Sequence, residues 1–456
     1  MTDAPQNPST GSTDSTESLE QTQTRLTAEG GVETAPATEP AHTGASFVKR
    51  SPVVVGVVAA LAVGAIIGGV SGAGVTLWAT HSNAGSSTIV GSPTATTITV
   101  NDTKSATQVT AVAAKAMPSV VTINVTSASA GGTGSGIVLT SDGYILTNTH
   151  VVTLDGAASD GTLTVTTSDG RLLKATVVGT DPISDLAVIK VDGATDLQPA
   201  EFADSSKLNV GDTAIAIGAP LGLAGTVTDG IVSALNRSIT IASSAVPGDT
   251  STEQAPNDQN GDTPYDFWNF DIPGQTQTQA TGSTATISLS VIQTDAAINP
   301  GNSGGALLDS DGKVIGVNVA IASAGSTTTG GQSGSIGVGF AIPANLAQRI
   351  AQEIMDNGTA THGLLGASVA DVTEDTNQKD PTVVGASIVE LSDGGAASAA
   401  GLKVGDIITK FEGLPITGKT DLTAQVRSLA AGAKATVTYV RDGKAAQVDV
   451  TLGELK

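Results

Sequence analysis

The chain of 456 residues contains no cysteine. Disulfides, thiol catalysis and zinc sites with a cysteine ligand are therefore excluded. Aromatic residues make up only 2% of the sequence, so the cores must be built from Val, Ile, Leu and Ala. Basic residues are also scarce, with 21 Lys and Arg against 43 Asp and Glu. The resulting net charge of −22 argues against nucleic acid as a partner.

The first 50 residues show no periodic pattern of apolar side chains. They are rich in Thr, Ser, Glu, Gln, Pro and Gly. A segment of this composition cannot bury enough apolar surface to offset the entropy of ordering the chain. Residues 1–50 are therefore interpreted as a disordered acidic tail.

Residues 51–79 contain no charged side chain. This run exceeds the roughly 20 apolar residues that cross a bilayer, so it predicts a transmembrane helix. A secretory signal peptide is one alternative, but its apolar region is shorter and it does not normally follow a long polar tail. A buried helix of a soluble domain is the other, and the length of the run and its basic flank argue against it. Lys49 and Arg50 precede the run, which predicts a cytoplasmic tail and an extracytoplasmic remainder. Residues 80–108 are rich in Ser, Thr and Gly and predict a flexible linker.

From residue 109 the sequence changes to short segments rich in β-branched residues, separated by turn residues. This rhythm is typical of an all-β protein, either a sandwich or a barrel. A helical pattern follows, which begins after Pro343 and ends at Gly358. The segments expected to form strands are residues 120–125, 136–140, 144–152, 163–167, 172–178 and 186–191, then 213–218, 225–235, 287–294, 306–308, 314–322 and 337–342.

The strand pattern lapses in the acidic stretch of residues 243–285. No Lys or Arg occurs between Arg237 and Lys313. A loop of this length in a compact domain is usually functional or disordered. The segment from Asp258 to Asp262 has some of the spacing of a calcium loop, but its glycine is misplaced and no bidentate Glu follows. We therefore predict no metal site.

The stretch from Gln293 to Leu308 places the hydroxyl of Ser303 in a glycine-rich turn between β-branched segments. Glycine tolerates the positive φ that such a turn demands. The backbone N–H groups of Gly301 and Ser303 would be free to converge on one point, which is the geometry of an oxyanion hole. Ser303 is the candidate nucleophile, and a plain glycine-rich turn is the alternative.

A serine nucleophile needs a base and a carboxylate that orients the base. Three of the four histidines lie in the polar tail, just beyond the apolar run and at a predicted domain junction. His150, inside the strand-like stretch of residues 144–152, is therefore the candidate base. Asp181 and Asp185 are the candidate carboxylates. Asp185 is preferred because it directly abuts an apolar strand and can be partly buried against the imidazole.

His150, Asp185 and Ser303 stand in the motifs TNTHVV, SDLAVIK and QTDAAINPGNSGGAL. Together these motifs resemble the HtrA family of trypsin-fold serine proteases, and the similarity runs from about residue 110 to the C-terminus. The resemblance implies a mainly β fold in which residues 109–358 form two six-stranded barrels, with the triad in the cleft between them. It also implies a homotrimer, unfolded or misfolded envelope proteins as substrates, and no cofactor.

The resemblance also locates a primary specificity pocket. Trypsin-fold enzymes that cut after basic residues carry an Asp six positions before the nucleophile, where this chain has Ala297. The residues implied as walls are apolar or glycine, so small or medium aliphatic side chains should be accepted. These wall residues are Val319, Ala320 and Ile321 on one side and Val338 to Phe340 on the other.

Residues 359–456 resemble the PDZ domain that follows the protease in this family. The resemblance implies that a peptide adds as a strand and that the backbone N–H groups of Leu365, Gly366 and Ala367 hold its terminal carboxylate. Leu422 and Val426, on a predicted helix, would line the pocket for the last side chain. An ordinary core-facing helix shows the same spacing, so both interpretations remain open.

The sequence thus predicts a single-pass, membrane-anchored serine endopeptidase with extracytoplasmic protease and PDZ domains. Its partners would be unfolded polypeptides and C-terminal peptides. A catalytically silent peptide-binding scaffold or chaperone of the cell envelope is the alternative. The presence of all three triad residues favours the enzyme.

Overall fold

The computed structural model describes residues 106–127, 131–154, 161–219, 225–243, 285–320, 337–378 and 382–455. All of them belong to one compact unit, which begins at Val90. The predicted tail and transmembrane helix, nearly all of the predicted linker, and the interior of the acidic stretch lie outside the described residues. Among the helices of the described part, none is long and apolar enough to cross a membrane.

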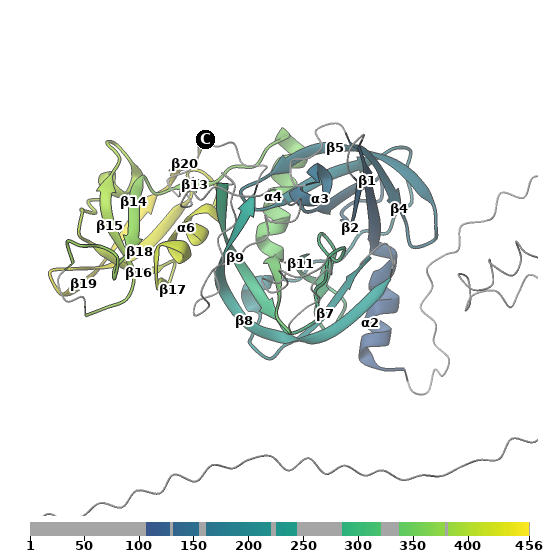
Figure 1. Cartoon of the computed structure of the whole chain (residues 1–456), viewed down its shortest axis with the longest axis horizontal. Helices are drawn as coiled ribbons and strands as arrows, with labels where there is room; N and C mark the ends of the chain where they lie inside the picture. Colours follow the sequence, from purple (N-terminus) through teal and green to yellow (C-terminus); the bar gives the residue numbers. More distant parts are fainter. Residues whose placement is uncertain are drawn as a thin grey trace, which may run out of the picture. The chain divides into compact units, whose positions relative to one another are not determined.

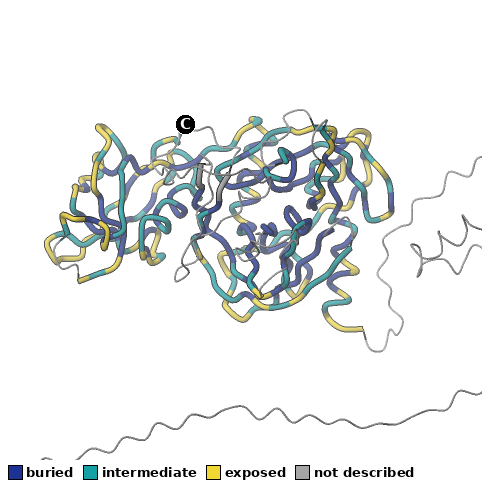
Figure 2. Tube along the Cα trace, viewed as in Figure 1, coloured by how far each residue is buried: buried dark blue, intermediate teal, exposed yellow. Residues whose placement is uncertain are grey.

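The first barrel is a closed antiparallel sheet in the order β1-β2-β3-β6-β5-β4 (Figure 1). Its β-branched and apolar side chains fill the interior, where Ile123, Ile145 and Ile189 are fully buried. Figure 2 shows buried stretches of backbone along the strands of both barrels. The alternation of inward and outward residues follows from the two-residue period of a strand. The strands are β1 (Val120–Thr126), β2 (Gly131–Val138), β3 (Tyr144–Thr147), β4 (Thr162–Thr166), β5 (Leu172–Asp181) and β6 (Leu186–Val191).

The second barrel is closed in the order β10-β11-β12-β9-β8-β7. One hydrophobic cluster joins it to the first barrel, because Leu146 and Leu186 of the first pack with Ile215 and Ile217 of the second. The prediction of a mainly β protein is confirmed. The strands are β7 (Thr213–Gly218), β8 (Thr226–Ser243), β9 (Ala285–Thr294), β10 (Ala306–Leu308), β11 (Val314–Val319) and β12 (Gly339–Pro343).

Helices α2 (Gln108–Ala116) and α4 (Ala344–Asn357) pack on the cluster shared by the barrels. As predicted, α4 follows Pro343 and ends at Gly358, whose φ of 80° is left-handed. Its Ile350 and Ile354 are fully buried, which an amphipathic helix achieves by placing its apolar stripe on the core. The described part of this domain also contains two short 3₁₀ helices, η1 (Met117–Ser119) and η2 (Ser205–Lys207).

The prediction of a strand over residues 144–152 is wrong in its second half. β3 ends at Thr147, and a short helix, α3 (Thr149–Thr153), follows. Thr149 turns the chain away from the sheet, because its N–H donates to the carbonyl oxygen of Asp185 at 3.2 Å and its hydroxyl donates to that of Leu186 at 2.7 Å. β-Branched residues here bury their side chains from a helix, so their pattern alone was misleading.

The C-terminal domain contains a sheet in the order β14-β15-β16-β18-β19, with β17 paired to β16, and a two-stranded sheet of β13 and β20. Its core includes Phe411, Ile388 and Val437. The elements are β13 (Gly363–Leu364), β14 (Ala367–Asp371), β15 (Ala386–Leu391), α5 (Ala396–Ala399), β16 (Ile407–Phe411), β17 (Leu414–Pro415), α6 (Lys419–Arg427), β18 (Lys434–Arg441), β19 (Lys444–Thr451) and β20 (Gly453–Glu454).

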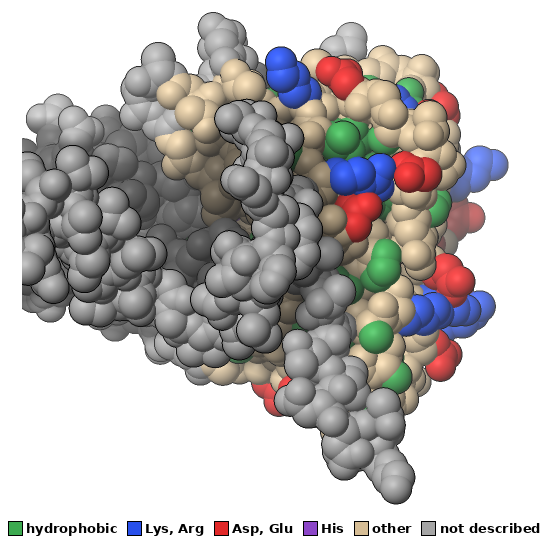
Figure 3. Space-filling view, turned by 90° about the vertical axis from the view of Figure 1, so that its right-hand side faces the viewer, with side chains coloured by type: hydrophobic (Ala, Val, Ile, Leu, Met, Phe, Trp, Pro, Cys, Tyr) green, Lys and Arg blue, Asp and Glu red, His purple; other side chains and the backbone are tan. Residues whose placement is uncertain are grey.

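Among the described residues that Figure 3 draws on one face, basic side chains lie beside acidic ones, and hydrophobic side chains are scattered between them. Solvent-exposed ion pairs join Lys115 to Glu201 at 3.3 Å and Arg171 to Asp196 at 2.8 Å. Such pairs contribute little to stability because water and salt screen them.

Candidate active site

Asp185 lies in the turn between β5 and β6 with a left-handed φ of 52°. This conformation is uncommon for a residue with a side chain, and here it turns the carboxylate toward α3. Oδ1 accepts a hydrogen bond from the backbone N–H of His150 at 3.1 Å, and Oδ2 lies 2.8 Å from His150 Nδ1. The carbonyl of Asp185 accepts from Asn148 Nδ2 at 2.8 Å, so the turn is held from both sides.

The His150 and Asp185 side chains are largely withdrawn from water, at 14% and 6% exposure. An electrostatic interaction is stronger in such an environment than in bulk water. A carboxylate on Nδ1 places the proton of a neutral imidazole on that nitrogen and leaves Nε2 as the proton acceptor. The arrangement therefore suits a general base.

Asp181, the other candidate carboxylate, lies in a different environment. Its Oδ1 is 2.8 Å from Nε2 of His362, and both side chains are almost fully buried. His362 Nδ1 lies 2.8 Å from the carbonyl oxygen of Arg427, at the end of α6. Asp181 thus contacts the histidine at the start of the C-terminal domain, whereas Asp185 contacts His150.

The turn before Ser303 has the features of a type II turn. The N–H of Asn302 donates to the carbonyl oxygen of Asn299 at 2.9 Å, Pro300 occupies the second position, and Gly301 has a φ of 97°. Within the described part of the chain, the N–H groups of Gly301 and Ser303 have no protein acceptor. These are the two backbone groups predicted to form an oxyanion hole beside the candidate nucleophile.

Ser303 itself is 5% exposed, and its Oγ accepts a hydrogen bond from the N–H of Ala320 at 3.0 Å. Gly304 packs so closely on the first barrel that a Cβ there would lie 2.3 Å from Thr147 Oγ1 and 3.2 Å from the nitrogen of Asn148. Asn148 stands two positions before His150. The turn therefore meets the part of the first barrel that carries His150 and Asp185.

Sequence reasoning missed Ser135, Asn148 and Thr149, which hold the site through the hydrogen bonds of their side chains and backbone. Two glycines flank Ser135 in β2, and glycine inside a strand often marks a close approach of other atoms. A Cβ on Gly134 would lie 2.5 Å from Val151 Cγ1, and one on Gly136 would lie 2.6 Å from Ile145 Cγ2. The pattern Gly-Ser-Gly was the signal that could have identified Ser135.

The residues expected around the specificity pocket lie on two paired strands. Val319 of β11 stands opposite Phe340 of β12, and both are buried, as is Ala320. Ala297 and Val338 are partly exposed, and Ile321 lies outside the described residues. Their role as a pocket stays a prediction.

The residues expected to bind a peptide surround the start of β14. The carbonyl oxygens of Leu365 and Gly366 accept from Ala397 and Ser392, at 2.8 and 3.0 Å, and Gly366 has a φ of 69°. Ala367 begins β14, which within the described residues pairs on one side only. Leu422 and Val426, at 1% and 5% exposure, pack in the domain core. Their role in a pocket stays a prediction.

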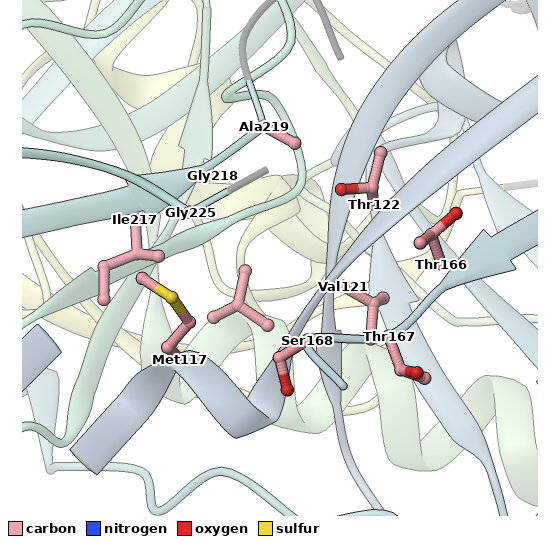
Figure 4. A pocket seen from close by; sticks show the side chains of 11 residues that line it. Met117, Val121, Thr122, Thr166, Thr167, Ser168, Ile217, Gly218, Ala219 and Gly225 are labelled. Carbon is pink, nitrogen blue, oxygen red and sulfur yellow. The ribbon is translucent and has the colours of Figure 1, made fainter. Parts of the chain in front are cut away.

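A shallow hollow lies where strands of the two barrels approach each other (Figure 4). Its lining combines the hydroxyls of Thr122, Thr166 and Thr167 with the apolar side chains of Met117 and Ile217. None of the described residues that line it is charged or carries an imidazole. Among the described residues, no three His, Asp or Glu side chains are placed to hold a metal ion.

Residues 134–317 match the family model described as a trypsin-like peptidase domain, and residues 363–452 match the model described as a PDZ domain. The chain thus combines a trypsin-like peptidase domain with a PDZ domain. It is 31% identical to a solved structure of the HtrA-type protease AlgW with a tripeptide, with a TM-score of 0.51. The similar region covers 75% of this chain and 96% of that structure. The chain belongs to the HtrA-type protease family.

Two curated relatives are also similar to this chain. The serine protease PepD of Mycobacterium tuberculosis is 43% identical over 348 residues, which are 75% of this chain and 65% of the relative. The periplasmic pH-dependent serine endoprotease DegQ of Escherichia coli is 36% identical over 324 residues, which are 70% of this chain and 59% of the relative. The chain therefore spans less than two thirds of the length of either relative.

Proposed function

We propose that this protein is a serine endopeptidase with Ser303 as nucleophile, His150 as general base and Asp185 as the group that orients the base. The observation that carries the proposal is the pair of N–H donors on Gly301 and Ser303, which bond to no acceptor among the described residues. They lie beside a serine whose turn packs on the barrel that holds the His150–Asp185 pair. A serine, an oriented imidazole and an oxyanion hole are the parts that acyl transfer requires.

In the proposed reaction, Ser303 Oγ attacks the carbonyl carbon of the scissile peptide while His150 Nε2 takes the hydroxyl proton. The negative charge that develops on the carbonyl oxygen is stabilised by the N–H groups of Gly301 and Ser303. Asp185 stabilises the imidazolium, which then gives its proton to the leaving amine. Water, deprotonated by His150, hydrolyses the acyl-enzyme and restores Ser303.

The substrates proposed are unfolded or misfolded proteins of the cell envelope. Relatives named as periplasmic proteases support an extracytoplasmic location, and an HtrA-type protease solved with a tripeptide supports peptide binding. We further propose that residues 51–79 anchor the chain in the membrane and that the protein assembles as a homotrimer. The uncharged apolar run supports the anchor.

A fluorophosphonate probe tests the proposed activity directly, because it reacts with an activated serine. The soluble fragment from residue 106 is expected to be labelled at Ser303 and to cleave an unfolded protein. The silent-scaffold alternative predicts neither label nor cleavage. A folded fragment that hydrolyses no unfolded protein would support that alternative and contradict the proposal.

The specificity pocket should favour cleavage after small or medium aliphatic side chains. A lysine ammonium near Ala297 would lose its hydration without gaining a carboxylate partner, a penalty of several kcal/mol. Peptide series that differ at one position should therefore show kcat/KM values at least about 100-fold lower for Lys than for Val. Ala297→Asp should narrow this difference, whereas Ala297→Asn, which adds similar bulk without charge, should not. Cuts mapped mainly after Lys or Arg would contradict the pocket.

The C-terminal domain should bind peptides that end in a free carboxylate and an apolar side chain. Binding is best measured by calorimetry on the Ser303→Ala variant of residues 106–456, which cannot turn the peptide over. This fragment also retains the contact of Gln425 Nε2 with Ser290 Oγ, 3.2 Å long, between α6 and β9. Amidation of the peptide removes the charge that the loop at Gly366 would hold, so affinity should fall at least tenfold, by roughly 1.4 kcal/mol or more. Equal affinities would leave the domain without this role.

The proposed anchor predicts opposite fates for the two ends of the chain. Protease added to spheroplasts should digest an epitope fused after Lys456 and spare one fused before Met1. The reason is that Lys49 and Arg50 favour retention of the preceding segment in the cytoplasm. Protection of both epitopes would show that the orientation is wrong.

A further inference from the structure

We propose that Ser135 is a positioning residue for the oxyanion hole. This inference rests on the proposed function, because it assigns a role in setting the N–H donors of Gly301 and Ser303. Ser135 belongs to β2 of the first barrel, whereas both donors belong to the second. The residue therefore connects the two halves of the site.

Ser135 is fully buried and holds the turn that carries Ser303 at two points. Its Oγ donates to the carbonyl oxygen of Gly301 at 2.7 Å, and its backbone N–H donates to the carbonyl oxygen of Ser303 at 2.8 Å. The Oγ also accepts from the N–H of Ala219 at 2.9 Å, just after β7. The hydroxyl thus uses its one hydrogen and one lone pair on two backbone groups of the second barrel.

The bonded groups alternate with the proposed donors along the turn. Ser135 fixes the peptide planes that follow Gly301 and Ser303, and the carbonyl of Asn302 between them accepts from Gly305 N–H at 2.9 Å. These three carbonyls are held, whereas the N–H groups of Gly301 and Ser303 bond to no acceptor in the described part of the chain. The separation and direction of the two donors depend on the fixed planes.

The surroundings limit the hydroxyl to its present position. A Cβ on Gly218 would lie 2.9 Å from Ser135 Oγ, so that side of the oxygen is closely packed. Thr147 Oγ1 donates to the Ser135 carbonyl at 2.7 Å and holds the strand that presents the side chain. Only the side-chain bond depends on residue type, because the backbone bond to Ser303 survives any substitution except proline. Ser135→Ala therefore isolates the hydroxyl.

Ser135→Ala should lower kcat by about 10- to 100-fold and change KM by less than about twofold. Loss of one oxyanion donor costs other enzymes roughly 10²–10³ in kcat, and here the donors remain but are less well aligned. Ser135→Cys, whose thiol is a weak donor of similar shape, should restore part of kcat. At equal amounts of folded protein, kcat should therefore be highest with Ser, lower with Cys and lowest with Ala. A residue that matters only for folding would not produce this order of kcat values.

A peptide boronic acid provides the second measurement, because its tetrahedral adduct with Ser303 places an oxygen in the hole. Its affinity for Ser135→Ala should fall by the same factor as kcat/KM. Affinity for the corresponding peptide amide, which forms no adduct, should be unchanged. An equal loss for both ligands would indicate a general distortion of the site and overturn the inference.

Thr294→Val is the matched control. Thr294 is also fully buried, and its hydroxyl likewise donates to a backbone carbonyl, that of Ile231 at 2.8 Å, and accepts a backbone N–H, that of Ala296 at 3.1 Å. This variant should lower the melting temperature but leave kcat near the wild-type value. The same fall in kcat for both variants would overturn the inference.

The outcomes also separate this inference from the proposed function. Wild-type kcat in Ser135→Ala, together with an inactive Ser303→Ala, would refute the role of Ser135 alone. Turnover in Ser303→Ala would refute the assignment of the nucleophile. If Ser135→Ala does not fold, the inference is tested with Ser135→Cys. A wild-type kcat and a wild-type boronate affinity in Ser135→Cys would then overturn the inference.

Discussion

Ser303→Ala is expected to lower kcat by roughly 10⁶-fold, as loss of the nucleophile does in other triad proteases. The fold should persist, but the variant is not expected to be neutral for stability. Ser303 is buried rather than on the surface, and its Oγ accepts the N–H of Ala320. Loss of that acceptor should cost about 1 kcal/mol of unfolding free energy.

Turnover of the purified variant on an unfolded protein is the measurement, with circular dichroism and thermal melting as the test of folding. Binding of substrate should remain, because the residues expected to form the pocket and the PDZ groove are unchanged. Activity within tenfold of the wild type would show that another residue is the nucleophile. Residual activity from contaminating proteases is excluded if fluorophosphonate labels no serine in the variant.

Asp185→Asn is expected to lower kcat by about 10⁴-fold. An amide can donate as well as accept, so it can hold the His150 ring in the wrong tautomer, and it provides no charge to stabilise the imidazolium. The backbone bond from His150 N–H to the Oδ1 position can persist with asparagine, so the turn should keep its shape. The pH dependence of kcat/KM, measured on the variant, would show whether the same group still acts as the general base.

Asp181→Asn is the control, since the same chemical change falls on a carboxylate that contacts His362 rather than His150. This variant should retain kcat within a few-fold of the wild type. It should instead be less stable, by about 1–3 kcal/mol, because the buried partner of His362 is altered. A loss of catalysis in Asp181→Asn, with Asp185→Asn active, would reverse the assignment of the two carboxylates.

The order of elements was readable from local patterns. Short β-branched segments gave most of the strands, and the helix between Pro343 and Gly358 was located by its end signals and apolar period. The error at His150 shows the limit of such patterns. Val151 and Val152 favour a strand locally, but hydrogen bonds to Asp185 and Leu186, more than 30 residues away, hold this segment as a helix.

The candidate nucleophile was visible because glycines around Ser303 mark a constrained turn. The choice between Asp181 and Asp185 could be argued from sequence only by their places beside a strand. The structure separates them by their partners, since Asp185 bonds to His150 and Asp181 to His362. The role of Ser135 was not predicted from the sequence, because its contacts to Gly301 and Ser303 join residues far apart in the chain.

Local patterns in the sequence were sufficient to predict a mainly β peptidase domain and the place of its last helix, and they indicated candidate residues for acyl transfer. Periodicity, glycine and proline positions, and side-chain chemistry are local properties, so they can be read along one chain. Only the folded structure shows which carboxylate contacts which imidazole and which serine holds the turn that carries Ser303. Those contacts depend on the closure of two barrels and on their packing against each other, which sets distances between residues up to about 180 positions apart.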